Sequence, residues 1–136
     1  MNYQNNISSM NFGMAYYTTG SKNFIRALKN KRNVPDLTNI NKEMAAAKKA
    51  VAETKWADVV SDGNEKGNLV HKVQYKYPNF NSESGRIEIW KSETTSYDSL
   101  PEAVNAALKQ EASSSELYTT MQETAKLMQE TKLGGK

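Results

Sequence analysis

Cysteine is absent from this chain of 136 residues, and histidine occurs once, as His71. The first absence excludes disulfide bonds, thiolate metal sites and a cysteine nucleophile, and the second excludes a zinc site built from several histidines. No apolar run approaches the roughly 18 residues that cross a bilayer. Polar residues also interrupt the first dozen positions, unlike a secretory signal. We therefore expect a cytoplasmic protein without a transmembrane segment, with non-classical export left open.

Acidic residues are missing from the first 35 positions. This stretch instead holds five basic residues: Lys22, Arg26, Lys29, Lys31 and Arg32. All 15 Asp and Glu residues follow it, together with the other bases, so the remainder is slightly acidic although the whole chain carries a net charge of +3. Charge this uneven is more informative about partners than the net charge, and the basic segment is either a solvated helix face or a contact for a partner of opposite sign.

The composition fits one small domain. Hydrophobic residues make up 38% and charged residues 24% of the chain, which is polar for a globular protein, and 136 residues suit a single core. Residues 1–20 are rich in Asn, Ser, Thr and Tyr and show neither a helix nor a strand period. We expect a flexible or partner-ordered N-terminal arm at 1–20, one α+β domain at 21–132, and a tail at 133–136.

Apolar spacing predicts two helices in the first half of the chain. Ser21 can cap a helix over about 21–31, and Pro35 is expected to stop it from continuing. A second helix is predicted over about 39–55. There the residues Ile40, Met44, Ala47 and Val51 recur on one helix face.

Three segments have the composition or alternation of strands, at about 56–61, 69–77 and 86–92. In the second of them, every other residue from Leu69 to Tyr77 is apolar, aromatic or histidine, which is typical of a half-buried strand. The segments between them are rich in Gly, Asn, Ser and Pro and predict turns. We expect a three-stranded antiparallel sheet.

Two further helices are predicted at about 99–112 and 115–131. Each begins at a capping box, Ser99 with Glu102 and Ser113 with Glu116, and three consecutive serines separate them. The last helix carries Leu117, Met121, Thr124 and Met128 at heptad-like spacing. The predicted element order is α-α-β-β-β-α-α, with the helices packed on the sheet.

No residue pattern in the chain indicates catalysis or a cofactor. His71 lies among apolar neighbours on its strand, so we interpret it as a packed residue rather than a catalytic base. The carboxylates of Asp58, Asp62 and Glu88 have no sequence feature that aims them at a cleft, so solvated charge is the simpler interpretation. We expect no enzyme activity, no catalytic residues, no cofactor and no metal.

Two surfaces are predicted to bind partners. One is the basic segment with Lys22, Arg26, Lys29, Lys31 and Arg32. The other is the outer face of the strand hairpin. If Tyr75 pairs with Ile87, Lys72 lies near Trp90 and Lys76 near Arg86 on that face. A tryptophan flanked by bases can anchor a protein interface or stack on a nucleobase.

We therefore expect a small non-enzymatic interaction protein that contacts a protein partner through the hairpin's outer face and the terminal segments. The alternative is a nucleic-acid-binding protein that uses the basic segment and the hairpin bases. An enzyme of unknown class ranks third. The methionine-rich last helix, placed after the serine hinge, also leaves a homo-oligomer open.

Overall fold

The computed structural model describes residues 3–4, 15–31 and 34–134. Its strands form one mixed sheet in the order β1-β5-β4-β3-β2. They are β1 (Tyr3–Gln4), β2 (Tyr16–Thr18), β3 (Ala57–Gly63), β4 (Leu69–Asn81) and β5 (Arg86–Tyr97). The helices are α1 (Lys22–Asn30), α2 (Val34–Ala50) and α3 (Leu100–Gly134).

The predicted α+β class and the antiparallel succession of β3, β4 and β5 are confirmed, but the sheet is larger than three strands. β2 adds to β3 in parallel, with Tyr16 opposite Val59, and the two-residue β1 pairs with β5. Both strands come from the segment predicted as an arm, so residues 15–20 belong to the sheet edge. Three residues such as Tyr16–Thr18 favour a strand by type, yet they are too few to show a period. Residues 5–14 lie outside the described part of the chain.

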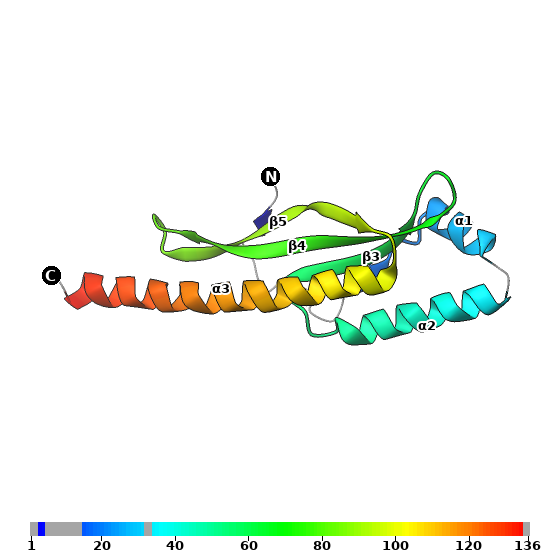
Figure 1. The fold of residues 1–136 in the computed structure, drawn as a ribbon. Helices are drawn as coiled ribbons and strands as arrows, with labels where there is room; N and C mark the ends of the chain where they lie inside the picture. The colour runs from blue at the N-terminus through cyan, green and yellow to red at the C-terminus, as the bar shows by residue number, and fades with distance from the viewer. Residues whose placement is uncertain (1–2, 5–14, 32–33, 135–136) are drawn as a thin grey trace.

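The β4–β5 hairpin is longer than predicted. β4 continues to Asn81 through Pro78, although 78–84 has the composition of a loop. Proline fits because β3 pairs with β4 only as far as Tyr75, so Pro78 has one strand neighbour among the described strands and needs no second ladder bond. The hairpin therefore extends beyond the rest of the sheet (Figure 1).

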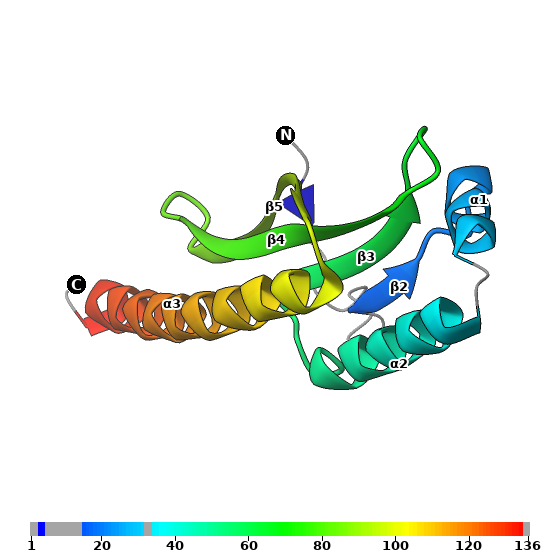
Figure 2. The same ribbon diagram turned by 45° about the vertical axis from the view of Figure 1, so that its right-hand side comes forward.

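Helices α2 and α3 pack on one face of the sheet, as Figures 1 and 2 show from two sides. The core between these layers contains Val59 and Val73 from the sheet, Val51 after α2, and Leu100 and Ala107 from α3, all at most 2% exposed. Alanines at the helix contacts let the helices lie close to the strands, since they place little side-chain volume between them.

Helix α1 sits at the end of the sheet, beside the β3–β4 loop (Figure 2). The predicted cap is present, because the Phe24 amide donates to the Ser21 hydroxyl at 3.1 Å. Phe24 and Ala27 are buried against the body. The helix backbone comes so close to β3 that a methyl group on Gly63 would lie 2.0 Å from the Asn23 carbonyl oxygen. Only glycine fits this contact without displacing α1.

Helix α2 lies five residues earlier than predicted, over Val34–Ala50 instead of 39–55. Pro35 occupies the first turn, where its missing N–H costs nothing, so it begins this helix as well as separating it from α1. The helix ends early because the chain turns there into β3. The amides of Lys55 and Trp56 donate to the Glu111 carboxylate of α3 at 2.7 and 2.9 Å.

Helix α3 is one continuous helix of 35 residues, so the predicted break at 113–115 and the second capping box are wrong. Ser114 is 2% exposed, and its hydroxyl donates to the Lys76 carbonyl at 3.0 Å while it accepts from the Gln110 amide at 2.8 Å. The serine is therefore used to dock the helix on β4. The first capping position is real, since the Glu102 amide donates to the Ser99 hydroxyl. Among the described residues, no helix is both long and apolar enough to cross a membrane.

Candidate interaction surfaces

The predicted basic segment becomes one exposed end of the molecule. Lys22, Arg26 and Lys29 lie at positions i, i+4 and i+7 of α1, so they form a single stripe, and all three are exposed. Lys31 follows at the helix end and is also exposed. Arg32, predicted to join them, lies outside the described residues.

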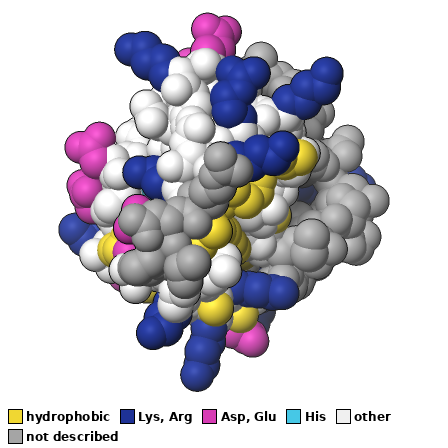
Figure 3. Space-filling model, turned by 90° about the vertical axis from the view of Figure 1, so that its right-hand side faces the viewer, with side chains coloured by type: hydrophobic (Ala, Val, Ile, Leu, Met, Phe, Trp, Pro, Cys, Tyr) yellow, Lys and Arg dark blue, Asp and Glu magenta, His cyan; other side chains and the backbone are white. Residues whose placement is uncertain are grey.

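The structure adds one more base to this end. The side-chain amide of Asn30 donates to the Gly67 carbonyl at 2.9 Å, which fixes the β3–β4 loop against α1 and places exposed Lys66 on the same end. Arg26 also lies against this loop, close to Gly67. Figure 3 faces this end and shows Lys and Arg side chains around it, with few acidic ones. We call the five residues Lys22, Arg26, Lys29, Lys31 and Lys66 the basic end.

The predicted register of the hairpin is wrong, and the patch built on it does not form. Trp90 lies opposite Tyr77, Arg86 opposite Asn81, and Lys72 opposite Ser96, so Lys72 is several residues away from Trp90 along the strands. Two features produce the shift. The hairpin is longer than the alternating segments, and a bulge at the level of Gln74 and Lys76 places one extra residue in β5, between Lys91 and Thr94.

The members of that predicted patch have separate environments. Lys76 is buried and pairs with Asp58, with 2.9 Å between Nζ and Oδ2. Arg86 is exposed at the hairpin tip. Trp90 is partly buried, its ring N–H donates to Glu88 at 3.2 Å, and β1 runs beside it with Tyr3 in register. These residues therefore do not form a joint binding site.

His71 belongs to a buried polar chain that the sequence did not reveal. The Tyr16 hydroxyl donates to Ser61 Oγ at 2.8 Å, and Ser61 Oγ lies 2.7 Å from His71 Nδ1. Burial lowers the pKa of His71, although Glu43 on α2 opposes the shift. A neutral ring can accept the serine proton. Serine and histidine at this distance resemble a nucleophile and its base, but Ser61 is fully buried, which leaves a substrate no access.

The lowered pKa of His71 predicts that stability falls in acid. The unfolded chain takes up the proton below pH about 6.5, while the folded chain resists it until a lower pH, so the free energy of unfolding should decrease as the pH falls from 7 to 5. Urea unfolding at several pH values measures this loss. His71→Gln is the control. With no other histidine in the chain, an equal slope between pH 5 and 7 in the variant would contradict the assignment.

The carboxylates that were interpreted as solvated have defined partners. Asp58 pairs with Lys76, and Glu88 accepts from Asn81 and Trp90. Burial alone would raise the pKa of Asp62, but hydrogen bonds from Thr19, the Gly63 amide and Ser21 lower it overall. In the part of the chain that the structure describes, no group of three Asp, Glu or His side chains could hold a metal ion.

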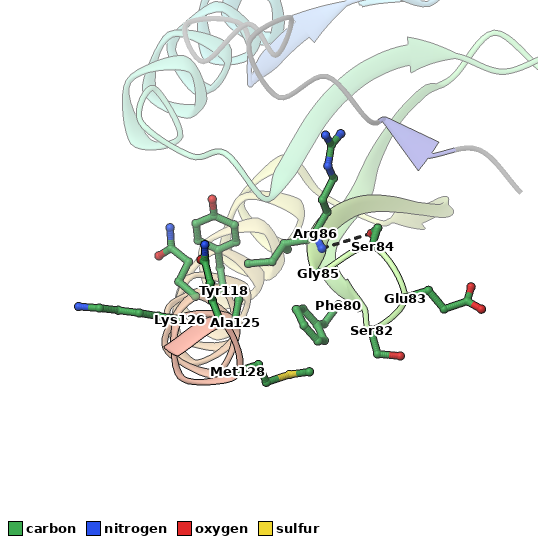
Figure 4. A pocket seen from close by; sticks show the side chains of 13 residues that line it. Phe80, Ser82, Glu83, Ser84, Gly85, Arg86, Tyr118, Ala125, Lys126 and Met128 are labelled. Carbon is green, nitrogen blue, oxygen red and sulfur yellow. Dashed lines mark hydrogen bonds between the residues drawn. The ribbon is translucent and has the colours of Figure 1, made fainter. Parts of the chain in front are cut away.

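An open groove of about 780 Å³ lies between the tip of the β4–β5 hairpin and the C-terminal half of α3. Its apolar lining comes from Phe80 and Ile87 on the hairpin and from Tyr118, Ala125 and Met128 on the helix. Figure 4 shows the Phe80 ring and the Met128 side chain pointing toward each other, while Lys126 points away. We call this feature the hairpin groove.

The helix wall of the hairpin groove extends past the body of the protein. Tyr118 is its last anchor, with its ring 5.4 Å from that of Trp56. Beyond that point α3 runs out alongside and past the hairpin tip (Figure 1). Leu117, Leu127 and Met128 on this distal half are 44%, 63% and 47% exposed. Exposed leucine and methionine at this density on a rigid helix are unusual for a surface without a partner.

Sequence reasoning missed the hairpin groove because both of its walls were predicted incorrectly. The sequence predicts a loop around Phe80, and it predicts two helices separated by serines where the structure has the single helix α3. The one available signal was the apolar spacing of Leu117, Met121 and Met128, which predicted an amphipathic helix but did not distinguish a core face from an exposed one.

A second, shallower depression of about 630 Å³ lies between α3 and the other end of the hairpin. Tyr75 and Tyr97 share a hydrogen bond between their hydroxyl groups there. Burial, together with this bond, raises the pKa of Tyr75 to about 12. The Tyr75 phenol therefore stays protonated near neutral pH, and it offers no phenolate for acid–base chemistry.

Comparison with known proteins leaves these surfaces to be judged on their own geometry. No known protein family, curated protein or solved structure matches this chain.

Proposed function

We propose that this chain is a non-enzymatic interaction protein and that its hairpin groove accepts an amphipathic helix of a protein partner. The observation that carries the proposal is the distal half of α3. This helix projects from the body with leucine and methionine exposed beside a groove of mixed character, whose walls include the apolar side chains of Phe80, Ile87 and Met128. Apolar side chains in the walls of a groove suit a helix that inserts apolar residues at spacings of three and four.

Several observations support an interaction role over catalysis. The serine–histidine pair is enclosed, and the carboxylates Asp58 and Asp62 are used in structural contacts. As in the sequence-based hypothesis, the proposed contact uses the C-terminal segment, which is the distal half of α3. The hairpin takes part through its tip and through the side that faces α3, where Phe80 lies, and no longer through its outer face.

Site-specific photo-crosslinking tests the hairpin groove. A photoreactive phenylalanine analogue at Gln122, on the groove wall, is expected to give a covalent adduct with a protein in a lysate of the native cells. The same analogue at Lys109, on the half of α3 that lies over the sheet, is the matched control. Mass spectrometry of the adduct identifies the partner peptide. Equal labelling from both positions, or none from Gln122, would contradict the proposal.

A second candidate function, nucleic-acid binding, is favoured by the basic end. The structure brings Lys66 beside the α1 stripe, and no acidic residue lies on α1. Phe24 and Ala27 of α1 are buried against the body, whereas Ile25 is exposed beside the cations. The exposed lysine and arginine side chains suit contact with phosphate groups without reading base sequence.

Salt dependence tests this second function. If the basic end neutralises about four phosphates, the affinity for a 20-base-pair DNA should fall by about a hundredfold between 50 and 200 mM salt. Replacing Lys22, Arg26 and Lys29 by glutamine should remove about three units from the slope of log affinity against log salt. Fluorescence anisotropy measures both quantities.

The control for the basic end is a triple glutamine variant at Lys109, Lys126 and Lys91, which changes net charge equally but lies on α3 and β5. This variant should keep most of the slope. Equal losses in the two variants would mean that net charge alone attracts the DNA. Absence of binding at 50 mM salt would exclude the nucleic-acid function.

A further inference from the structure

We infer that the exposed apolar seam on the distal half of α3, beside the hairpin groove, pairs with the same seam of a second copy of this chain, in a two-fold antiparallel dimer. The inference goes beyond the proposed function, because of the four seam residues Leu117, Met121, Thr124 and Met128 only Met128 also lines the hairpin groove. It is carried by the repeat along α3, by the placement of the helix charges, and by the match between the apolar residues of two antiparallel copies.

A single seven-residue repeat runs through α3. In its first half the repeat positions Leu100, Ala103, Ala107 and Ser114 are buried against the sheet. The same positions continue as Leu117, Met121, Thr124 and Met128, of which Met121 is half-buried and the other three are exposed. Apolar residues at alternate spacings of four and three form the seam of paired helices. This side of the distal half therefore has the pattern of a packed helix face, although most of it is exposed.

The charges of α3 are kept away from this seam. Glu102, Glu116, Glu123 and Glu130 are separated by multiples of seven, so they form one line along the helix. That line lies two positions after Met121 and Met128, roughly on the opposite side of the helix. The positions that flank the seam in the distal half are Tyr118, Thr120, Ala125 and Leu127, all uncharged. Two copies can therefore bring their seams together without placing like charges against each other.

An antiparallel two-fold arrangement matches the residues of this seam. Leu117 of one copy faces Met128 of the other, and Met121 faces Thr124. Each layer of the interface therefore contains one methionine. Opposed helix dipoles also favour this direction. Leu127, the most exposed large hydrophobic residue at 63%, lies beside the seam and becomes covered.

The stretch from Leu117 to Met128, which the two copies share in this pairing, is about 18 Å long at 1.5 Å per residue. This is less than two heptads, which is short for a coiled coil of free peptides. Here each helix is already formed and held by its own sheet, so pairing does not have to bear the cost of helix nucleation. We expect a reversible dimer rather than an obligate one.

Sedimentation velocity on the full chain, from about 10 µM to about 0.5 mM, tests the inference across the range in which weak interfaces dissociate. The sedimentation coefficient should rise with concentration toward that of a dimer. Leu117→Glu introduces two charges into the seam and should raise the dissociation constant by at least about 100-fold. Leu108→Glu is the control, because Leu108 is 40% exposed on the half of α3 that lies over the sheet and outside the seam. Circular dichroism checks that both variants keep the fold.

The outcomes separate the dimer from the groove function. A dimer that Leu117→Glu dissociates and Leu108→Glu does not supports the inference. A monomer at every concentration overturns it. In that case an adduct between Gln122 and another protein leaves the groove function standing. A dimer that both variants leave intact also overturns it, since it must use another surface.

Discussion

Replacing Gly63 by alanine is expected to destabilise the protein by about 3 kcal/mol or more, at the upper end of what overpacking costs. The added methyl would lie 2.0 Å from the Asn23 carbonyl oxygen and 2.6 Å from the Phe24 amide nitrogen. These are backbone atoms of α1, so no side-chain rotation relieves the contact. The helix must move as a unit, and Phe24 and Ala27 then lose their burial.

Urea unfolding followed by circular dichroism measures this effect, with Gly85→Ala as the matched control. Gly85 has a φ of +74° but open space around it, so its alanine variant bears only the cost of a left-handed backbone, about 1 kcal/mol. The difference between the two variants isolates the steric contact. If Gly63→Ala costs no more than Gly85→Ala, α1 does not pack against β3 as described.

The second large effect is expected at the buried ion pair of Lys76 and Asp58. Asp58→Asn should cost about 3 kcal/mol, because it leaves the Lys76 ammonium, only 9% exposed, without its counter-charge. Lys76→Met should cost clearly less. The methionine fills the same space, and Asp58, whose side chain is 21% exposed, can reach water. The predicted order of the two variants follows from which charge is left buried.

Chemical denaturation of the two single variants and of the double variant checks this order. The double variant should be more stable than Asp58→Asn alone, since it removes the stranded charge. A non-zero coupling energy in this cycle shows that the two side chains interact directly. Additive losses would mean that the pair contributes nothing beyond its separate contacts.

The sequence predicted those parts of the fold that have a long local signal. The alternation from Leu69 to Tyr77 identified β4, and the spacing from Ile40 to Val51 identified α2. The parts that it missed depend on distant contacts. Tyr16–Thr18 becomes a strand because β3 offers an edge, and Ser114 stays helical because the Lys76 carbonyl lies opposite it. A polar residue that breaks a helix in water can dock it on a sheet.

The candidate surfaces show the same limit. The stripe of Lys22, Arg26 and Lys29 was predicted because it is local to one helix. Lys66 joins it through the loop contact of Asn30, which no spacing rule anticipates. The assumed register places Trp90 opposite Lys72. The longer hairpin places Trp90 opposite Tyr77 instead, five residues further along β4.

The contact of Glu111 with the start of β3 has a consequence for biosynthesis. The carboxylate that accepts from the Lys55 and Trp56 amides lies 55 or more residues downstream of them. At about 5–20 residues per second, a ribosome needs about 2–7 s to add α3 after the strands have been made. During that interval the face of the sheet that receives Leu100 and Ala107 is uncovered. The nascent chain therefore exposes this apolar face until α3 has been synthesised. Slow codons within α3 would prolong the exposure.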